Sequence, residues 1–393
     1  MKRVRITPRE NWQAKVEQLG LIYHTSDDGA VYWDESVFYT FTSRQVDELE
    51  KATATLNDLC LKACDEVITK RRWADVGLDA AAGELVTQSW ERDEITVYGR
   101  FDLVYDGLMG RPPKMLEYNA DTPTALLEAA VVQCHWAQER DKSLDQFNSI
   151  HERLIEAWAR VKKEMGPAVW FSAMQESFED TVTANYLRDT AVQAGLRTEY
   201  LSVEDIGCRE TTHEFVDLND RSIPIMFKLY PWEWMLTDQF GKHVAKSPTR
   251  WLEAPWKMVL SSKGLLAVLW EMFPQCPYLL PTYRDPGPLG GGKERQGLGT
   301  YVEKPLRSRE GANIRIVQNG TVTAATGGPY RGACVYQAVC EPPRMGDLPG
   351  GGQARPIIGS WMVNGYACGI GIREDAGPIT GNTSRFVPHV IEH

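Results

Sequence analysis

LEYNADTP, residues 116–123, is the stretch of sequence that most strongly indicates the fold. It ends an apolar run that is typical of a β-strand, and it places Glu117 and Asn119 two positions apart. Side chains two apart on a strand lie on the same face, so a carboxylate and a carboxamide would lie side by side. A tight turn favours Asn and Asp but does not require an aligned glutamate. The stretch therefore indicates a place where oxygen atoms are gathered.

The strand before it, within GRFDLVYDG, carries a second pair, Arg100 and Asp102. If the two strands pair antiparallel, Asp102, Glu117 and Asn119 converge with the guanidinium of Arg100 on one face. Oxygen donors without histidine or thiolate suit Mg²⁺. A neighbouring arginine would stabilise a transferring phosphate or a developing oxyanion. The alternative is an exposed cross-strand salt bridge followed by a turn.

Hydrophobic spacing and turn signals predict a chain of the α/β (α+β) class around this hairpin. The predicted elements before residue 165 are a helix over 44–70 with Ser43 as its N-cap, the hairpin strands 96–105 and 114–119, a helix over 124–140 capped by Thr122 or Thr124, and a helix over 145–164.

The sequence changes character over residues 168–206. AVWFSAM is a predicted strand, SFEDTVTANYLRDTAVQAG a helix and TEYLSV a second strand, which together form a βαβ unit. IPIMFKLYPWEWM adds a further strand. We therefore expect a small α/β subdomain at about 166–250, inserted into a single unit of 1–393. It separates an N-terminal part, about 1–165, from a C-terminal part of short glycine-rich strands, about 251–393.

The composition is that of an ordinary globular protein, with 43% hydrophobic and 24% charged residues. The formal net charge of −10 argues against a nucleic-acid binder, which needs a basic face. The eight cysteines form no close CxxC pair, so we expect reduced thiols. The sequence shows no apolar leader and no long uncharged apolar stretch, so we expect a cytoplasmic protein without a membrane span.

Two lysines occupy positions suited to phosphate. Lys304, in TYVEKPLRSREGANI, ends a strand ahead of a glycine-containing loop whose amides would cover a phosphate; the alternative is a solvated lysine on an edge strand. Lys263, in SSKGLLAVLW, begins a predicted helix, where a cation is unfavourable unless an anion accompanies it. ACVYQAVCEPP is either a strand that holds an adenine ring or a core strand that ends at Pro-Pro. A glycine-rich surface loop is expected over 285–299.

The segment GIGIREDAGPITGNTSRFVPH gathers charged and amide side chains among glycines, beside apolar strand residues. Such density favours a catalytic or substrate-holding loop. The side chains concerned are Arg373, Glu374, Asp375, Asn382 and Arg385.

Five segments occur in the order seen in the synthetase part of the glutathionylspermidine synthase family, which the sequence resembles over essentially its whole length. They are GRFDLVYD…LEYNADTPTALLEA, FKLYPWEWM, SSKGLLAVLW, YVEKPLRSREGANI and VYQAV. The resemblance implies an ATP-grasp ligase in the circularly permuted arrangement of eukaryotic glutathione synthetase, using ATP and Mg²⁺. The implied roles are Mg²⁺ ligation by Asp102, Glu117 and Asn119, stabilisation of the transferring phosphate by Arg100, and ATP binding by Lys263, Lys304, Gly311 and Gln337.

Two departures from the family pattern bear on the substrates. Two-domain members carry an N-terminal amidase with a catalytic Cys and His, whereas this sequence begins in the synthetase part, so no amide hydrolysis is expected. Ala125 stands where the bifunctional members have a cysteine in the thiol-peptide site. The acid substrate is therefore left open between glutathione and another peptide or acid.

The implied reaction has two steps. ATP phosphorylates a carboxylate, and a primary amine, a polyamine by resemblance, then displaces phosphate to form an amide. Carboxylates should hold the remaining ammonium groups, although acids at a helix start commonly only compensate the helix dipole. The alternatives are a ligase with a peptide or amino-acid acceptor and a non-catalytic nucleotide-binding protein. Only small-molecule partners are expected. The candidate substrate residues are Asp121, Thr122, Thr124, Glu176, Glu179, Asp180, Arg373 and Asp375.

Overall fold

The computed structural model describes residues 1–393 apart from 27–28, 291–298, 349–350, 382–383 and 393. The predicted hairpin is confirmed, and it ends a five-stranded antiparallel sheet with the order β18-β17-β16-β3-β4. Its register pairs Arg100 with Asn119 and Asp102 with Glu117. The strands are β3 (Tyr98–Val104), β4 (Lys114–Asn119), β16 (Arg355–Val363), β17 (Tyr366–Asp375) and β18 (Arg385–Val387).

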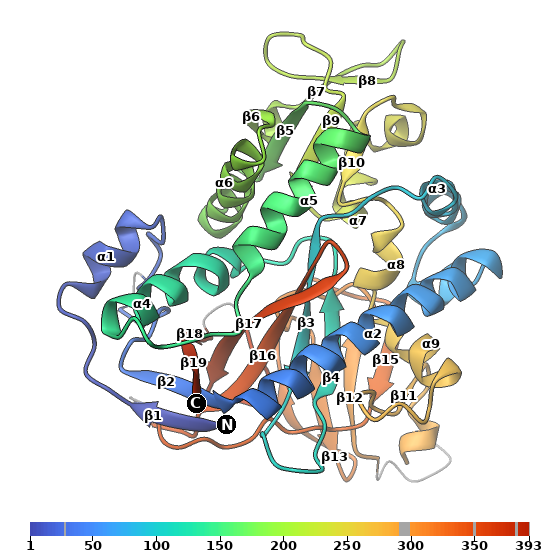
Figure 1. Ribbon diagram of the computed structural model, residues 1–393. Helices are drawn as coiled ribbons and strands as arrows, with labels where there is room; N and C mark the ends of the chain where they lie inside the picture. The colour runs from blue at the N-terminus through green and yellow to red at the C-terminus, as the bar shows by residue number, and fades with distance from the viewer. Residues whose placement is uncertain (27–28, 291–298, 349–350, 382–383, 393) are drawn as a thin grey trace.

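The long predicted helix lies across this sheet as α2 (Ser43–Thr69), in contact with β16 and β17 (Figure 1). The prediction of Ser43 as its N-cap was wrong, because Thr42 takes that position. The Thr42 hydroxyl accepts a hydrogen bond from the backbone N–H of Gln45, and the Gln45 side chain accepts one from the backbone N–H of Thr42. This reciprocal arrangement satisfies two backbone donors at the start of the helix.

A second five-stranded antiparallel sheet, in the order β11-β15-β12-β13-β14, lies against β4. Lys304 and Gln337 of this sheet donate hydrogen bonds to the backbone carbonyls of Leu116 and Met115 on β4. The helix α9 (Gly264–Met272) packs against β11, β15 and α2. The strands are β11 (Thr282–Tyr283), β12 (Tyr301–Pro305), β13 (Arg315–Gln318), β14 (Thr321–Ala325) and β15 (Cys334–Gln337).

The predicted βαβ unit is confirmed, because β5 and β6 pair in parallel on either side of α6. Strands β9 and β10 extend this sheet, also in parallel, to the order β10-β9-β5-β6, and a hairpin of β7 and β8 projects beyond it (Figure 1). The helices α5 and α6 pack on each other beside the sheet. The elements are α5 (Ile150–Glu164), β5 (Ala168–Ala173), α6 (Phe178–Gln193), β6 (Arg197–Ser202), β7 (Gly207–Arg209), β8 (Glu214–Val216), β9 (Ile225–Leu229) and β10 (Arg250–Leu252).

A three-stranded sheet, in the order β1-β2-β19, joins segments from near both ends of the sequence. β1 pairs antiparallel with β2, and β19 pairs parallel with it, so the two ends lie close together in Figure 1. These strands are β1 (Lys2–Arg5), β2 (Val37–Thr42) and β19 (His389–Glu392).

The helix after LEYNADTP begins at Leu126, and Ala125 before it has a φ of 62°. The prediction that Thr122 or Thr124 caps this helix was wrong, since both residues precede Ala125. The Thr122 hydroxyl instead accepts a hydrogen bond from Arg309 at 2.7 Å. The helix contains a π-helical turn, η2 (Glu128–Val132), and continues as α4 (Gln133–Arg140). Single π-turns in helices occur frequently at functional sites.

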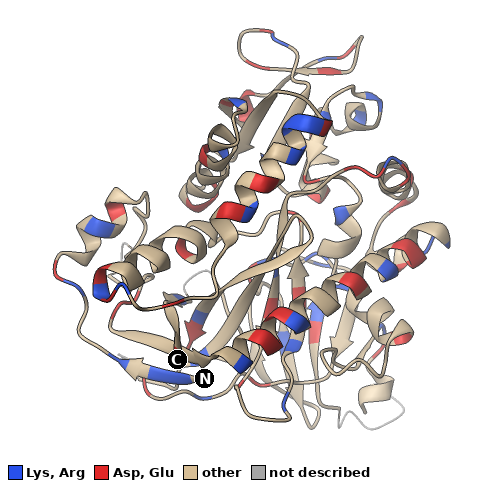
Figure 2. Cartoon of the chain, viewed as in Figure 1, with Lys and Arg blue, Asp and Glu red and all other residues tan. Residues whose placement is uncertain are grey.

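The remaining elements are short or peripheral. Acidic and basic residues intermix along α2 and α5 (Figure 2), as expected for the exposed faces of surface helices. The cysteines are all free where the structure describes them, in agreement with the predicted thiols. Within the described ranges, no helix has the length and apolar character needed to cross a bilayer. Most of the predicted surface loop, residues 291–298, lies outside the described residues. The other elements are α1 (Trp12–Gln18), η1 (Trp73–Val76), α3 (Ala80–Glu91), η3 (Val203–Asp205), α7 (Trp232–Met235), η4 (Gly241–Lys246), α8 (Lys257–Ser261) and η5 (Gly287–Leu289).

Candidate functional site

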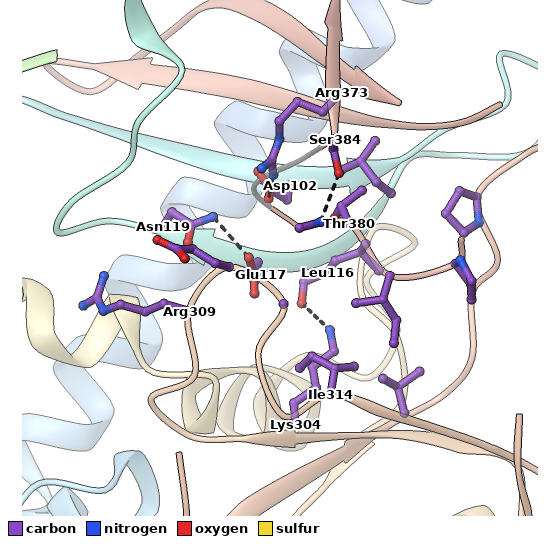
Figure 3. Close-up of a pocket in the computed structure, with 18 of the residues that line it drawn as sticks. Asp102, Leu116, Glu117, Asn119, Lys304, Arg309, Ile314, Arg373, Thr380 and Ser384 are labelled. Atoms are coloured by element: carbon purple, nitrogen blue, oxygen red, sulfur yellow. Dashed lines mark hydrogen bonds and ion pairs between the residues drawn. The ribbon is translucent and has the colours of Figure 1, made fainter. Parts of the chain in front are cut away.

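A cavity of about 430 Å³ lies between the two five-stranded sheets, on the face of the hairpin that carries the predicted oxygen donors (Figure 3). The loop after β12, the loop after β17 and the start of α6 also line it. The predicted site residues that line the cavity are Arg100, Asp102, Glu117, Asn119, Thr122, Thr124, Glu179, Asp180, Lys304, Gly311, Gln337 and Arg373.

Two arginines share one buried carboxylate on the wall formed by β3. Asp102 accepts a hydrogen bond from Arg100 through Oδ1 and another from Arg373 through Oδ2, each at 2.7 Å. Gly359 lies opposite Asp102 on the neighbouring strand β16, and a Cβ added there would lie 2.8 Å from Cδ of Arg100. The absent side chain leaves room for Arg100. Two guanidinium groups around one carboxylate give this wall a net positive charge.

Glu117 lies between two lysines. Its Oε2 is 2.9 Å from Nζ of Lys263, and its Oε1 accepts a hydrogen bond from the side chain of Asn119 at 3.3 Å. Burial opposes the ionisation of Glu117, but Lys263 and Lys304 outweigh it and lower the pKa of Glu117 to about 2. Lys263 occupies the N-cap position of α9. Glu117 is therefore the anion that a lysine at this helix start was expected to need.

Lys304 is buried in the wall of the cavity. Its Nζ donates a hydrogen bond to the backbone carbonyl of Leu116 at 3.0 Å (Figure 3). It donates another to Oε1 of Gln337 at 2.6 Å. Burial lowers the pKa of Lys304 to about 8, although the charge of Glu117 opposes the shift. The lysine is thus a cation held by two neutral acceptors. An ammonium group has three N–H donors, and among the described residues the third has no hydrogen-bond acceptor.

The donor set on the hairpin fits a hard cation. Asp102 and Glu117 offer carboxylates and Asn119 offers an amide oxygen, which are ligand types that Mg²⁺ accepts. Across the residues that the structure describes, no three His, Cys, Asp or Glu side chains are grouped to hold a metal ion. The amide oxygen of Asn119 is therefore needed to complete a three-donor set from the protein. The arginine and lysine cations beside these donors suit a polyanion that reaches the same place.

One end of the cavity is apolar. Leu116, Val302, Ile316 and Val339 line it, and the segment predicted to hold an adenine ring contributes its wall just after β15. Gln337, the last residue of β15, is buried. Its side chain accepts a hydrogen bond from Lys304 and donates one to the backbone of β4. The apolar end and the row of cations therefore adjoin each other, as the two halves of a nucleotide would require.

Two loops meet over the cavity at Gly311. This glycine has a φ of +70°, and a Cβ added to it would lie 2.4 Å from the carbonyl oxygen of Thr380 in the loop after β17. Both features favour glycine at this position. Arg309, two residues earlier, donates to Thr122 and forms an ion pair with Glu233 at 2.8 Å. The loop after β12 is thus tied to both sides of the cavity.

The opposite end of the cavity is acidic. Glu179 and Asp180, in the first turn of α6, line it beside Tyr32 and Trp234. Burial raises the pKa of Asp180 to about 6, while a hydrogen bond with the Ser177 side chain opposes the shift. Two adjacent carboxylates and an aromatic ring favour a cationic group with an apolar chain.

Several predicted residues do not line this cavity. Asp121 is buried behind it, paired with Lys228 at 2.8 Å. Glu176 is exposed to solvent. Asp375 accepts hydrogen bonds from the backbone of Gly377 and the hydroxyl of Ser384, within its own loop. Lys263 lines an adjoining cavity of about 110 Å³ instead.

The C-terminal charged segment is tied to other parts of the fold. Glu374 pairs with Arg3 at 2.6 Å, and Arg385 pairs with Asp34 at 2.9 Å. Arg373 alone among these predicted charges reaches the cavity within the described part of the chain. Asn382 lies outside the described residues.

Sequence reasoning missed lining residues that come from segments far apart. Tyr32, Trp234 and Arg309 line the cavity, but no spacing relates them to the hairpin. Arg309 carried the strongest available signal, since it lies between Lys304 and Gly311 in the predicted phosphate loop.

Comparison with known proteins relates the chain to ligases. It matches the family model described as glutathionylspermidine synthase preATP-grasp over residues 3–392. It is 41% identical, over 99% of both chains, to a Haemophilus influenzae protein named "Putative acid--amine ligase". It is 26% identical to trypanothione synthetase of Crithidia fasciculata, over 76% of this chain and 48% of that protein. It is 25% identical to bifunctional glutathionylspermidine synthetase/amidase of Escherichia coli, over 78% of this chain and 52% of that protein.

The chain thus spans about half the length of the last two relatives. A solved structure of a glutathione synthetase-like effector from Globodera pallida aligns with a TM-score of 0.57, over 97% of this chain and 96% of that one, at 8% identity. That likeness supports a glutathione synthetase-like ATP-grasp fold. The ligase names of the relatives support the expected enzyme class, an ATP-dependent carbon–nitrogen ligase. Because the family model matches residues 3–392 and the Haemophilus influenzae relative aligns over 99% of both chains, the chain belongs to the glutathionylspermidine synthase preATP-grasp family.

Proposed function

We propose that this protein joins the carboxylate of a peptide or glutathione-like acid to a polyamine such as spermidine, in an ATP-dependent reaction through an acylphosphate. The observation that carries the proposal is the meeting, in one cavity, of the hairpin's oxygen donors with Lys304, Arg100 and Arg373. An exposed cross-strand salt bridge would not gather buried cations and oxygen donors around a common space. The family of ligases to which the chain belongs supports the same chemistry.

ATP would lie across the cavity from its apolar end to its cationic centre. Its base would contact Leu116 and Val339, and its phosphates would reach Lys304, with Lys263 supporting them from behind Glu117. Asp102, Glu117 and Asn119 would hold Mg²⁺, which when bound neutralises phosphate charge. Gly311 would let the loop after β12 approach the phosphates closely.

The fixed arginines would stabilise the charge that develops on phosphoryl transfer. Arg100 and Arg373 are held in place by Asp102, so their guanidinium groups need little reorganisation in the transition state. The reacting carboxylate would approach from the side of Thr122 and Thr124, where Arg309 offers a further cation. Ala125 lines the cavity there without a thiol, which leaves room for an acid other than glutathione.

The amine would bind at the acidic end. Glu179 and Asp180 would accept hydrogen bonds from its ammonium groups, and Trp234 would cover its methylene chain. Glu176, Asp121 and Asp375 lie away from this end, so the proposal assigns the amine to Glu179 and Asp180 rather than to the wider acidic set.

We also propose that the fold is circularly permuted and contains an inserted subdomain. The sheet of the hairpin combines β3 and β4 with β16 and β17, while residues between them form the parallel sheet and the second antiparallel sheet. This order supports a circularly permuted, glutathione synthetase-like arrangement. The unit at about 166–250 would be an inserted subdomain between parts at about 1–165 and 251–393.

A substrate screen tests the function. Purified protein with ATP and Mg²⁺ is combined with glutathione or other peptides and with spermidine, spermine or neutral amino acids. We expect ADP release that requires both an acid and a polyamine, and a product whose mass equals their sum less one water. Preference for a neutral amino acid would favour a peptide ligase. Nucleotide binding without any product would favour a non-catalytic protein.

A matched pair of variants ties that activity to the cavity. Glu117→Gln removes a charge from the donor set. Glu303→Gln removes a charge from the ion pair with Arg315, which joins β12 to β13 in the second five-stranded sheet. The first should abolish product formation, and the second should leave it near the wild-type rate.

A further inference from the structure

Glu128 is a buried acid that the proposed function does not use. It is fully buried in the π-helical turn η2. Its Oε1 accepts hydrogen bonds from the hydroxyl groups of Tyr32 at 2.6 Å and Tyr23 at 3.0 Å. Its Oε2 is buried without a hydrogen-bond partner among the described residues. Burying a carboxylate with one oxygen unsatisfied is costly, so its presence requires an explanation.

Tyr32 connects this acid to the cavity. Tyr32 lines the acidic end together with Glu179 and Asp180, and its hydroxyl donates to Glu128 behind the wall. Tyr23 donates to the same oxygen of Glu128 but is not one of the described residues that line the cavity. A hydrogen-bonded path therefore runs from the amine end through Tyr32 to an acid that solvent does not reach.

The surroundings of Glu128 suit a proton acceptor. Burial raises the pKa of Glu128 to about 7, the charge of Glu179 adds to the shift, and the hydrogen bonds from Tyr32 and Tyr23 oppose it. The groups that face Glu128 are thus the two tyrosines of the N-terminal segment and Glu179 of α6. The charge of Asp180 also raises the pKa of Tyr23. A general base is most effective when its pKa lies near the working pH.

We propose that Tyr32 and Glu128 form a relay that removes a proton from the ammonium group of the amine substrate before it attacks. The proposal rests on the ligase function above. The ammonium N–H proton passes to the Tyr32 oxygen as the Tyr32 proton passes to Glu128, which becomes a neutral carboxylic acid. The neutral amine then attacks the acyl carbon, so a C–N bond forms and the C–O bond to phosphate breaks. The nitrogen's surplus proton leaves with the phosphate. After product release, Glu128 returns its proton through Tyr32 to water that enters the cavity.

Two nucleophiles separate this role from a structural one. Spermidine is an ammonium ion near neutral pH and must lose a proton, whereas hydroxylamine is already neutral and attacks acylphosphates directly. With glutathione as the acid, Glu128→Gln should lower kcat with spermidine by about 100-fold or more. The rate of hydroxamate formation should stay within a few-fold of wild type. Tyr32→Phe, which breaks the path but leaves Glu128 in place, should show the same pattern.

Tyr23→Phe is the matched control. It removes an equivalent hydrogen bond to Glu128 but leaves the path through Tyr32 intact. Its spermidine rate at high pH should stay within a few-fold of wild type. The acid limb of its pH–rate profile should move to higher pH, because Glu128 loses a hydrogen bond that lowers its pKa. Glu128→Gln should abolish that limb.

Each other outcome overturns the relay. If Glu128→Gln and Tyr32→Phe lower the rates with spermidine and with hydroxylamine equally, both residues have a structural role and do not transfer a proton. An unchanged spermidine rate in either variant would exclude them from proton transfer. A wild-type protein that forms neither product overturns the ligase function with these substrates, and the relay with it.

Discussion

Replacing Lys304 by methionine tests whether the cavity binds a polyphosphate. The substitution keeps an unbranched side chain and removes the charge. In the wild-type protein Nζ is fixed by Gln337 and the carbonyl of Leu116, and neither partner neutralises it. The charge is therefore available to an anion in the cavity, while Lys263 is already paired with Glu117.

The expected loss follows from the burial of Lys304. Two unit charges about 4 Å apart attract by roughly 4 kcal/mol at an effective dielectric constant of about 20. Removing one partner of a buried charge pair costs about 2–5 kcal/mol. Since each 1.4 kcal/mol corresponds to a factor of about ten, Lys304→Met should weaken ATP binding by about 30- to 4,000-fold.

Calorimetry with a non-hydrolysable ATP analogue and Mg²⁺ measures this change. Wild-type affinity should fall as the pH rises through about 8, because a lysine with a lowered pKa loses its charge there. The affinity of Lys304→Met should not change over that range. The control is Lys114→Met on β4, whose Nζ donates to backbone carbonyls of Pro277 and Leu279. That variant should change the affinity less than about fivefold. Equal losses in both variants, or none in Lys304→Met, would refute the reasoning.

Four further variants test other parts of the site. Glu117→Ala and Asn119→Ala should each abolish ADP production while thermal unfolding stays cooperative, and near wild-type turnover with normal Mg²⁺ dependence would make the hairpin structural. Gly311→Ala should raise the KM for ATP more than tenfold, because its Cβ meets the Thr380 carbonyl and its φ disfavours alanine; an unchanged KM would show that the two loops separate without cost. Asp180→Asn should raise the KM for spermidine, and added salt should raise it in the wild type more than in the variant, since partly exposed pairs are screened; a salt-independent KM contradicts the acidic amine site.

The hairpin could be predicted because its information is local. Alternating residues place Arg100, Asp102, Glu117 and Asn119 on one face, and the turn residues between the strands fix their direction. The lysine at the start of α9 was recognisable by its conflict with the helix dipole. The βαβ unit was readable from the change of hydrophobic period.

Pairings between distant segments gave no such signal. Asp121 is two residues beyond Asn119 in the sequence, yet a buried ion pair with Lys228 on β9 removes it from the cavity. Glu128 lies within an Ala- and Leu-rich stretch that predicts an ordinary core helix, and its tyrosine partners are about a hundred residues away.

The two cap predictions were wrong for different local reasons. At α2 the neighbouring hydroxyl residues Thr42 and Ser43 compete for one position. After LEYNADTP the positive φ of Ala125 delays the helix until Leu126.

The pairing of β19 with β2 has a consequence for how the protein acquires its cavity. The cavity takes Asp102 from β3 and Arg373 from β17, and the sheet that holds the two ends of the sequence together closes only with residues 389–392. Folding must therefore bring together segments separated by nearly the full chain, and such high contact order slows it. During synthesis, β3 and β4 leave the ribosome long before their partners and expose a strand edge in the meantime. We expect ribosome-bound chains that end before β16 to be open to proteases and unable to retain nucleotide.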